Sequence, residues 1–180
     1  MDCDECNDLL LKALPRAAPA KLLQAIALAY PFIRCNKAGE TAPPICMQCS
    51  DEGAVGLSRA YTEAPPGRVV LCANRLRSSE VEEALVHELV HLYDHCRGAD
   101  LKQCNQLAAS EVRAAREAEC HVRYKGESSL PHQLSSFLHK RCVVSKAKLS
   151  TRSMFPGNGG CCVDAVFEEA VADMEPFVSE

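Results

Sequence analysis

The sequence predicts an α+β fold stapled by disulfide bonds, and three features lead to this prediction. Residues 85–97 are an apolar run with helical spacing that contains histidines. Residues 55–61 and 68–73 flank a turn-rich joint and predict two antiparallel strands. Twelve cysteines are spread over the 180 residues, which favours disulfides formed in an oxidising compartment. We therefore expect a small antiparallel sheet packed on a histidine-bearing helix.

The length and composition fit a single domain over residues 1–180, because a hydrophobic content of 47% is enough for a core. Within this domain we expect N-terminal helices and a loop pinned by cysteines over residues 1–50. We expect the functional core over residues 53–125 and C-terminal helices over residues 126–180. The expected elements are, in order, two short helices within 3–30, a loop over 36–52, the two strands, and helices over 79–97, 106–124 and 163–174.

Charge and hydropathy count against several classes of function. The chain has 20 Lys and Arg against 24 Asp and Glu, so it lacks the basic character of nucleic-acid-binding proteins, and we expect no nucleic-acid partner. No apolar run approaches the roughly 18 residues of a membrane span, so any membrane contact would be peripheral. The start of the chain, residues 1–5, is acidic, unlike a basic presequence.

The stretch 85–97 contains the pattern His-Glu-x-x-His, with His87, Glu88 and His91 at its fixed positions. Residues four apart project from one face of an α-helix, so the two imidazoles can bind one tetrahedral metal ion. Zinc held in this way keeps a position for water, whose pKa falls towards about 7. A carboxylate beside this water can take its proton, and we assign this general-base role to Glu88. The motif predicts a hydrolase with one catalytic zinc ion.

The surroundings of the motif decide whether it is a chance match. Leu85, Leu89 and Leu92 form an i, i+4, i+7 stripe, which predicts a largely buried helix. Histidines and a glutamate in such a helix are costly unless a metal and its water satisfy them. The surroundings therefore favour a metal site.

The third protein ligand has several candidates, which are Asp94, His95, Glu111, Glu117 and Glu119. His95 is eight residues from His87, about 12 Å along a helix, which is too far for one ion. Asp94 is nearer but would crowd the same helix face, so it is the alternative third ligand. We expect Asp94 and His95 to support the ligands through hydrogen bonds instead.

A second helix, predicted over residues 106–124, is the better source of the third ligand. Glu111 lies twenty residues beyond His91, and a connection of about ten residues followed by an antiparallel helix would return it to the histidines. This spacing resembles that of the glutamate zincins, in which two histidines on one helix and a glutamate on the next hold the ion. The alternative is that Glu111 is a solvated charge that pairs with Arg113 or Arg116.

Four cysteines near the N-terminus permit two kinds of site. Cys3 and Cys6, and likewise Cys46 and Cys49, have the Cys-x-x-Cys spacing of zinc knuckles, so the four could form one structural zinc site. The other cysteines of the chain need a further explanation under that hypothesis. We therefore expect these four to form disulfides, with a pairing that the sequence does not reveal.

Longer stretches around these residues resemble a known family. Residues 87–97 read His-Glu-Leu-Val-His-Leu-Tyr-Asp-His-Cys-Arg, and Val-Leu-Cys-Ala-Asn at 70–74 and Ser-Glu-Val-Arg-Ala-Ala at 110–115 flank them. Together they closely resemble the mitochondrial inner-membrane zinc metalloproteases that mature an ATP-synthase subunit, also called Ku-binding-protein-like metallopeptidases. Ala109 departs from the family pattern, in which a cysteine often precedes the Ser-Glu pair.

The resemblance implies a zincin-like endopeptidase of the mitochondrial intermembrane space, disulfide-bonded and peripheral to the inner membrane. It implies a protein substrate, the precursor of the proton-channel subunit of ATP synthase, whose leader the family removes and whose assembly it assists. From their place after Glu111 in the sequence, His121 and Tyr124 are the only candidates for stabilising the transition state, and the alternative for each is a packing or surface role. The rival hypothesis is a non-catalytic assembly factor, and the intact Glu88 counts against it.

Overall fold

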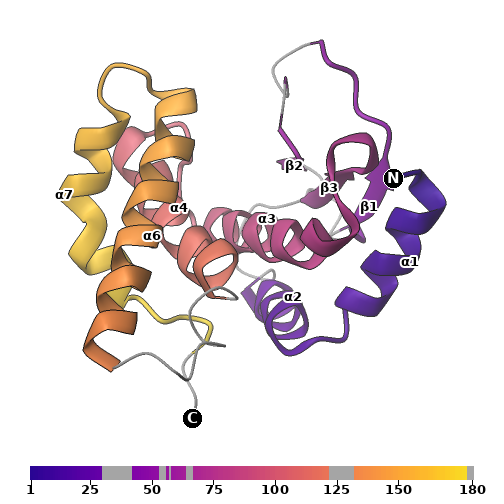
Figure 1. Ribbon diagram of the computed structural model, residues 1–180, viewed down its shortest axis with the longest axis horizontal. Coiled ribbons are helices and arrows are strands. Elements are labelled where there is room, and N and C mark those ends of the chain that lie inside the picture. Colours follow the sequence, from indigo (N-terminus) through magenta and orange to yellow (C-terminus); the bar gives the residue numbers. More distant parts are fainter. Residues whose placement is uncertain (30–41, 53–55, 57, 64–66, 122–131, 178–180) are drawn as a thin grey trace. The chain divides into compact units, whose positions relative to one another are not determined.

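The computed structural model describes residues 1–29, 42–52, 56, 58–63, 67–121 and 132–177 (Figure 1). The chain divides into two compact units, Met1–Gly98 and Ala99–Glu180. Helices and a small sheet are both present, so the α+β class predicted from the sequence is confirmed. The single domain expected over residues 1–180 stays a prediction.

The first unit combines three α-helices with a three-stranded sheet. The two helices expected within residues 3–30 are present and are separated around Pro15. Asp2 caps the first of them, because its side chain accepts a hydrogen bond of 2.8 Å from the backbone N–H of Glu5. The elements are α1 (Cys3–Ala13), α2 (Ala17–Ala29), β1 (Ile45–Met47), β2 (Ala60–Glu63), β3 (Arg68–Cys72) and α3 (Val81–Cys96).

The sheet is mixed, with the strand order β1-β3-β2. β2 and β3 are antiparallel, as the sequence predicted, with Ala60 opposite Leu71. The expectation of a purely antiparallel sheet was wrong, because β1 lies parallel to β3, with Ile45 opposite Val70. β1 falls in the segment expected to be a loop. Its three residues are too few for a period-two pattern to indicate a strand.

The first expected strand, over residues 55–61, begins later than predicted, at Ala60. Residues 53–55 and 57 lie outside the described residues, as do residues 64–66 of the joint. β3 is the central strand, and its residues 69–72 are buried. A central strand buried along its length suits the Val-Val-Leu-Cys run that the sequence shows there.

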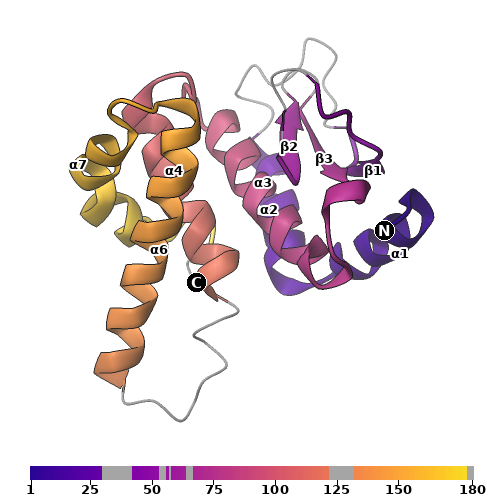
Figure 2. The ribbon, with the colours of Figure 1, turned by 45° about the horizontal axis from the view of Figure 1, so that its top comes forward.

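Helix α3 is the element around which the first unit packs. It contacts α1, α2, β2 and β3, and Figure 2 shows it beside the sheet. Leu85 and Leu89 are fully buried, as the apolar stripe predicted. The expected helix over residues 79–97 is therefore confirmed, with α3 itself beginning at Val81 after a turn of 3₁₀ helix, Ser78–Glu80.

Two disulfides hold the first unit together. Cys6 bonds to Cys46 and so joins α1 to β1, while Cys49 bonds to Cys72 at the end of β3. Cys3, which we expected in a disulfide, is a thiol in the structure. The disulfides expected from the cysteine content are thus present, and the thiolates of a four-cysteine zinc site are not available together.

The second unit packs three helices, α4 (Cys104–Glu117), α6 (His132–Met154) and α7 (Gly159–Ala172). Val112, Val143 and Val163 form the centre of its core. Disulfides Cys104–Cys162 and Cys120–Cys142 join the helices across this core. The helix expected over residues 106–124 ends at Glu117, and the one expected over residues 163–174 begins earlier, at Gly159.

Close packing explains the glycine at the start of α7. A Cβ atom added to Gly159 would lie 2.8 Å from the backbone carbon and oxygen of Thr151, so a larger residue would push α6 and α7 apart. Among the described helices, none has both the length and the apolar composition that crossing a bilayer requires.

Candidate active site

Helix α3 brings the two motif histidines together. The Nε2 atoms of His87 and His91 are 3.1 Å apart, and the ring planes meet at 80°. Two nitrogen ligands of one tetrahedral ion, at bond lengths of about 2.0–2.1 Å, lie about 3.3 Å apart. The spacing of the two imidazoles therefore fits joint binding of one ion.

Glu88, one residue after His87, is held by a side chain from the sheet. The hydroxyl of Thr62 on β2 lies 3.0 Å from the carboxylate Oε2 of Glu88 and 3.1 Å from its backbone carbonyl oxygen. The hydroxyl has one proton to donate, so it serves these two acceptors alternately. This contact fixes the carboxylate beside the helix face that carries the histidines.

Sequence reasoning missed Thr62. It stands where the expected turn-rich joint begins, and a threonine there carries no signal of a contact with a helix 26 residues later in the chain. The contact arises because β2 pairs with β3 in a fixed register, with Thr62 opposite Val69, and α3 packs on both strands.

The start of α3 is tied to the same strand region by ion pairs. Arg59, which precedes β2, lies 3.1 Å from Glu80 and 3.4 Å from Glu83. The backbone N–H of Arg77 donates a 2.9 Å hydrogen bond to Glu80. This hydrogen bond lowers the pKa of Glu80 below its ordinary value, and the charge of Arg59 acts in the same direction.

The other predicted site residues of the first unit also lie on α3. Asp94 follows His91 by three positions, on the same face of the helix, and is 4% exposed. His95 is half-buried in the last turn. The positions of both allow the supporting role that the sequence predicts, which stays a prediction.

The remaining predicted residues belong to the second unit. Glu111 is on α4 and is 7% exposed, so it is not the solvated charge that the alternative hypothesis required. The Nδ1 atom of His121 lies 3.9 Å from a carboxylate oxygen of Glu117. Tyr124 lies outside the described residues.

The two arginines near Glu111 bond to the C-terminal part of the chain. Arg113 forms a 3.2 Å ion pair with Asp173 and donates to the backbone carbonyl of Glu175. Arg116 forms a 2.6 Å ion pair with Glu117 and donates to carbonyls at the end of α7. Both arginines are buried and thus have a structural role.

The chemistry of the donor set suits a metal ion. Two imidazoles and one carboxylate are a donor set of catalytic zinc sites that leaves a position for water. In the first unit, His87 and His91 supply the two imidazoles of such a set. Imidazole ligands favour zinc and related transition metals over calcium or magnesium, which prefer oxygen ligands.

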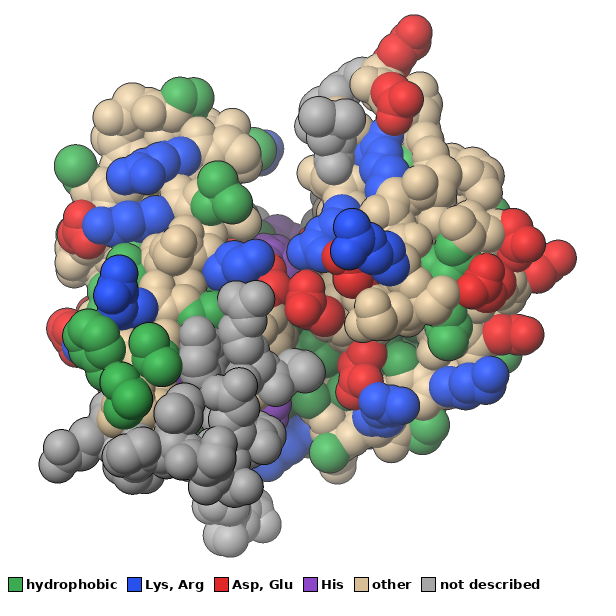
Figure 3. All heavy atoms as spheres, viewed as in Figure 1, with side chains coloured by type: hydrophobic (Ala, Val, Ile, Leu, Met, Phe, Trp, Pro, Cys, Tyr) green, Lys and Arg blue, Asp and Glu red, His purple; other side chains and the backbone are tan. Residues whose placement is uncertain are grey.

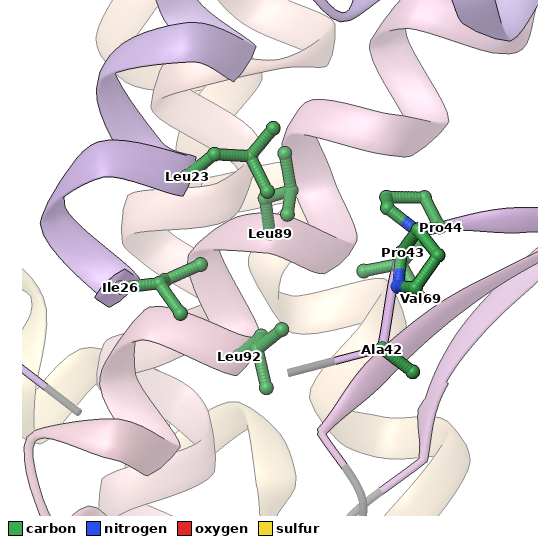
Figure 4. A pocket seen from close by; sticks show the side chains of 8 residues that line it. All are labelled: Leu23, Ile26, Ala42, Pro43, Pro44, Val69, Leu89 and Leu92. Atoms are coloured by element: carbon green, nitrogen blue, oxygen red, sulfur yellow. The ribbon is translucent and has the colours of Figure 1, made fainter. Parts of the chain in front are cut away.

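An apolar pocket of about 160 Å³ lies on another side of α3. Figure 4 shows side chains from α2, α3 and β3 pointing into it, with two prolines at its edge. Leu89 follows His87 by two positions, about 200° around the helix, so the pocket lies away from the histidines. It contains no group that could perform the chemistry. The lining residues are Leu23, Ile26, Ala42, Pro43, Pro44, Val69, Leu89 and Leu92.

The chain is similar to known proteins over most of its length. The sequence profile described as the peptidase M76 family matches residues 5–178. The mitochondrial inner membrane protease ATP23 of Malassezia globosa is 28% identical over 97% of this chain and 75% of that protein. The human homolog of that protease is 30% identical over 96% of this chain and 69% of the human protein. The Xenopus laevis homolog is 31% identical over 73% of this chain and 56% of that protein. No solved structure matches the chain.

Proposed function

This chain belongs to the peptidase M76 family, and we propose that it is a zinc-dependent endopeptidase that works through His87, Glu88 and His91. The observation that carries the proposal is the convergence of the two Nε2 atoms to 3.1 Å beside a glutamate held by Thr62. A fold that needed only packing from α3 would gain nothing from this arrangement, because buried polar groups must be satisfied.

His87 and His91 are the first two metal ligands in this proposal, and Glu111 is the third. Asp94 is the alternative third ligand, since it shares the helix face of the histidines. Zinc held by these residues would supply Lewis-acid chemistry, which would polarise the scissile carbonyl and lower the pKa of a bound water towards about 7. Two imidazoles and a carboxylate on successive helices constitute a zincin-like centre of the glutamate type.

Glu88 performs the proton transfers of peptide hydrolysis. It accepts a proton from the attacking water and delivers it to the leaving amine nitrogen. The bond from Thr62 restricts the rotamer of Glu88, so the carboxylate is oriented before the substrate arrives. His121 and Tyr124 stay proposals for transition-state stabilisation.

The peptide substrate would bind along the edge of β2. Among the described strands, β2 pairs with β3 alone, and its Thr62 contacts the base directly. An extended peptide added to this edge by backbone hydrogen bonds would run past Glu88. A protein substrate in an extended conformation therefore suits the geometry.

We place the enzyme in the mitochondrial intermembrane space, at the inner membrane. Its relatives are named mitochondrial inner membrane proteases, and four disulfides among the described cysteines require an oxidising compartment. The substrate that we propose is the precursor of the proton-channel subunit of ATP synthase. The rival proposal is a non-catalytic factor that assists assembly of ATP synthase.

The substitution Glu88→Gln separates the two proposals. In the enzyme it should reduce cleavage of the purified subunit precursor by about 10²–10⁴-fold, because the general base is lost. Zinc content, measured by plasma mass spectrometry, should stay the same. Unchanged cleavage by Glu88→Gln would contradict the mechanism. If neither wild type nor Glu88→Gln cleaved the precursor while both still assisted assembly of ATP synthase, the non-catalytic factor would be favoured.

Zinc stoichiometry identifies the third ligand. We expect Glu111→Gln to release the ion at a chelator concentration that leaves wild type loaded, while Asp94→Asn retains it. The reverse result would assign the ligand to Asp94. His91→Asn serves as the positive control for metal loss, and circular dichroism checks that each variant is folded.

A further inference from the structure

The outward face of α6 carries large hydrophobic side chains. Leu134 is 44% exposed, Phe137 56% and Leu149 71%. They lie in a row of exposed positions spaced three or four residues apart, which places them on one face of the helix. We call this row the α6 face. Its members are Leu134, Phe137, Arg141, Ser145 and Leu149.

The charge of α6 has one sign. The helix, His132–Met154, contains no aspartate or glutamate, although the chain as a whole has a net charge of −4. Its basic residues are Lys140, Arg141, Lys146, Lys148 and Arg152.

The acidic partners of α6 lie on α7, to the side of the α6 face. Lys140 lies 2.6 Å from Glu168, and Lys148 lies 2.6 Å from Asp164. The guanidinium of Arg152 also turns towards α7, because it lies against Gly160 in the first turn of that helix. The charge on the α6 face itself is therefore the guanidinium group of Arg141. The guanidinium of Arg141 lies 5.7 Å from the ring centre of Phe137, so a cation and an aromatic ring share one surface.

Figure 3 shows this combination directly. Hydrophobic side chains gather beside basic ones over α6, and the acidic side chains of this unit lie towards its margin. Isolated exposed leucines are common on protein surfaces and need no partner. A row of Leu, Phe and Arg along a helix that has no acidic residue suits contact with an anionic surface, which accepts apolar side chains between its headgroups and attracts cations.

We propose that the α6 face docks on an anionic lipid bilayer. Phe137 and the two leucines would enter the boundary between headgroups and acyl chains, while Arg141 binds a lipid phosphate. The helix lies in the membrane plane. This proposal goes beyond the peptidase mechanism and does not depend on the metal site.

A lipid surface fits the α6 face better than a peptide does. The exposed side chains stand on one side of a single helix, and the charge of Arg141 has the sign that anionic headgroups attract. The names of the relatives also place these proteins at a membrane. The second unit thus offers a way to hold the protein at a membrane surface.

Flotation of the full-length protein with lipid vesicles tests the proposal. One set of vesicles consists of phosphatidylcholine, and the other also contains phosphatidylglycerol. The apolar variant is Leu134→Ser/Phe137→Ser, and the charge variant is Arg141→Gln. The matched controls lie on α1, where Leu11 is 67% exposed and Lys12 is exposed: Leu11→Ser and Lys12→Gln.

We expect wild type to float with the anionic vesicles and to be released by high salt. The apolar variant should bind about tenfold more weakly or worse. The charge variant should lose its preference for phosphatidylglycerol, and both controls should bind like wild type. Equal binding of wild type and the apolar variant would overturn the proposal, as would an equal loss in the controls. Because flotation measures no cleavage, its failure leaves the peptidase proposal intact.

Discussion

The two units of the chain use their buried polar groups in different ways. In the first unit, polar side chains on α3 direct atoms that can bind a metal toward one another, as the 3.1 Å distance between the Nε2 atoms of His87 and His91 shows. In the second unit, buried polar side chains satisfy the backbone, as Arg116 does at the end of α7. A buried polar residue therefore identifies a site only when its partners are considered.

The arginines of α4 show what a structural use looks like. The last carbonyl groups of a helix lack partners within the helix. Arg116 donates at 2.8 Å to the carbonyls of Val171 and Asp173, and Arg113 pairs with the side chain of Asp173. These bonds join the C-terminal segment to α4 and offset the cost of burying two guanidinium groups.

The largest effect on stability should come from Arg116→Met. The substitution keeps apolar volume but removes the bonds to α7 and leaves the buried carboxylate of Glu117 with only its 3.9 Å contact to His121. We expect a loss of about 3 kcal/mol in the free energy of unfolding, measured by denaturant titration. Lys12→Met, at an exposed position of α1, should change stability by less than about 0.5 kcal/mol. An equally small change in the free energy of unfolding of both variants would contradict the structural role of Arg116.

Thr62→Val should affect catalysis and spare stability. The hydrogen bond that orients Glu88 is lost, so kcat/KM should fall about tenfold, which corresponds to about 1.4 kcal/mol. Thr62→Ser should restore most of the activity, because it keeps the hydroxyl.

The matched control for Thr62 is in the second unit. Thr151 is fully buried in α6, and its hydroxyl donates at 2.8 Å to the carbonyl of Ala147. Thr151→Val should leave kcat/KM unchanged. If the two threonine variants lost activity equally, the contrast between the units would not hold.

The smallest effect is expected for Glu80→Gln. The folded state lowers the pKa of Glu80, so its stabilisation is fully present above the ordinary glutamate pKa and is lost as the pH falls through the folded-state value. At neutral pH we expect the variant to be less stable by about 0.5 kcal/mol, a magnitude typical of surface pairs. Thermal unfolding at several pH values measures the difference, which should vanish in acid. If the stability difference between wild type and Glu80→Gln persisted at acid pH, the effect would come from packing and not from the charge of Glu80.

Local patterns predicted the helices of the first unit well. The i, i+4, i+7 leucines required α3, and the spacing of His87 and His91 required that their rings share a face. The strands β2 and β3 followed from their apolar composition and the turn residues between them. β1 escaped prediction, because a strand of three residues exists only through its pairing with β3.

Disulfide pairing was likewise beyond the sequence. The spacing of Cys3 and Cys6 matches that of Cys46 and Cys49, and this symmetry suggested that the four act alike. In the structure, Cys6 bonds to Cys46, Cys49 bonds to Cys72, and Cys3 remains a thiol. Which sulfurs meet depends on where α1 and β1 pack, and their packing is a long-range property.

The sequence by itself determined that His87 and His91 meet, because side chains four residues apart on one helix come together through local geometry alone. Only the tertiary structure decided which hydroxyl holds Glu88, because Thr62 reaches it through the register of β2 with β3 and the packing of α3 on that sheet. Local geometry is encoded within a few residues, whereas a contact across 26 residues depends on every element packed between them.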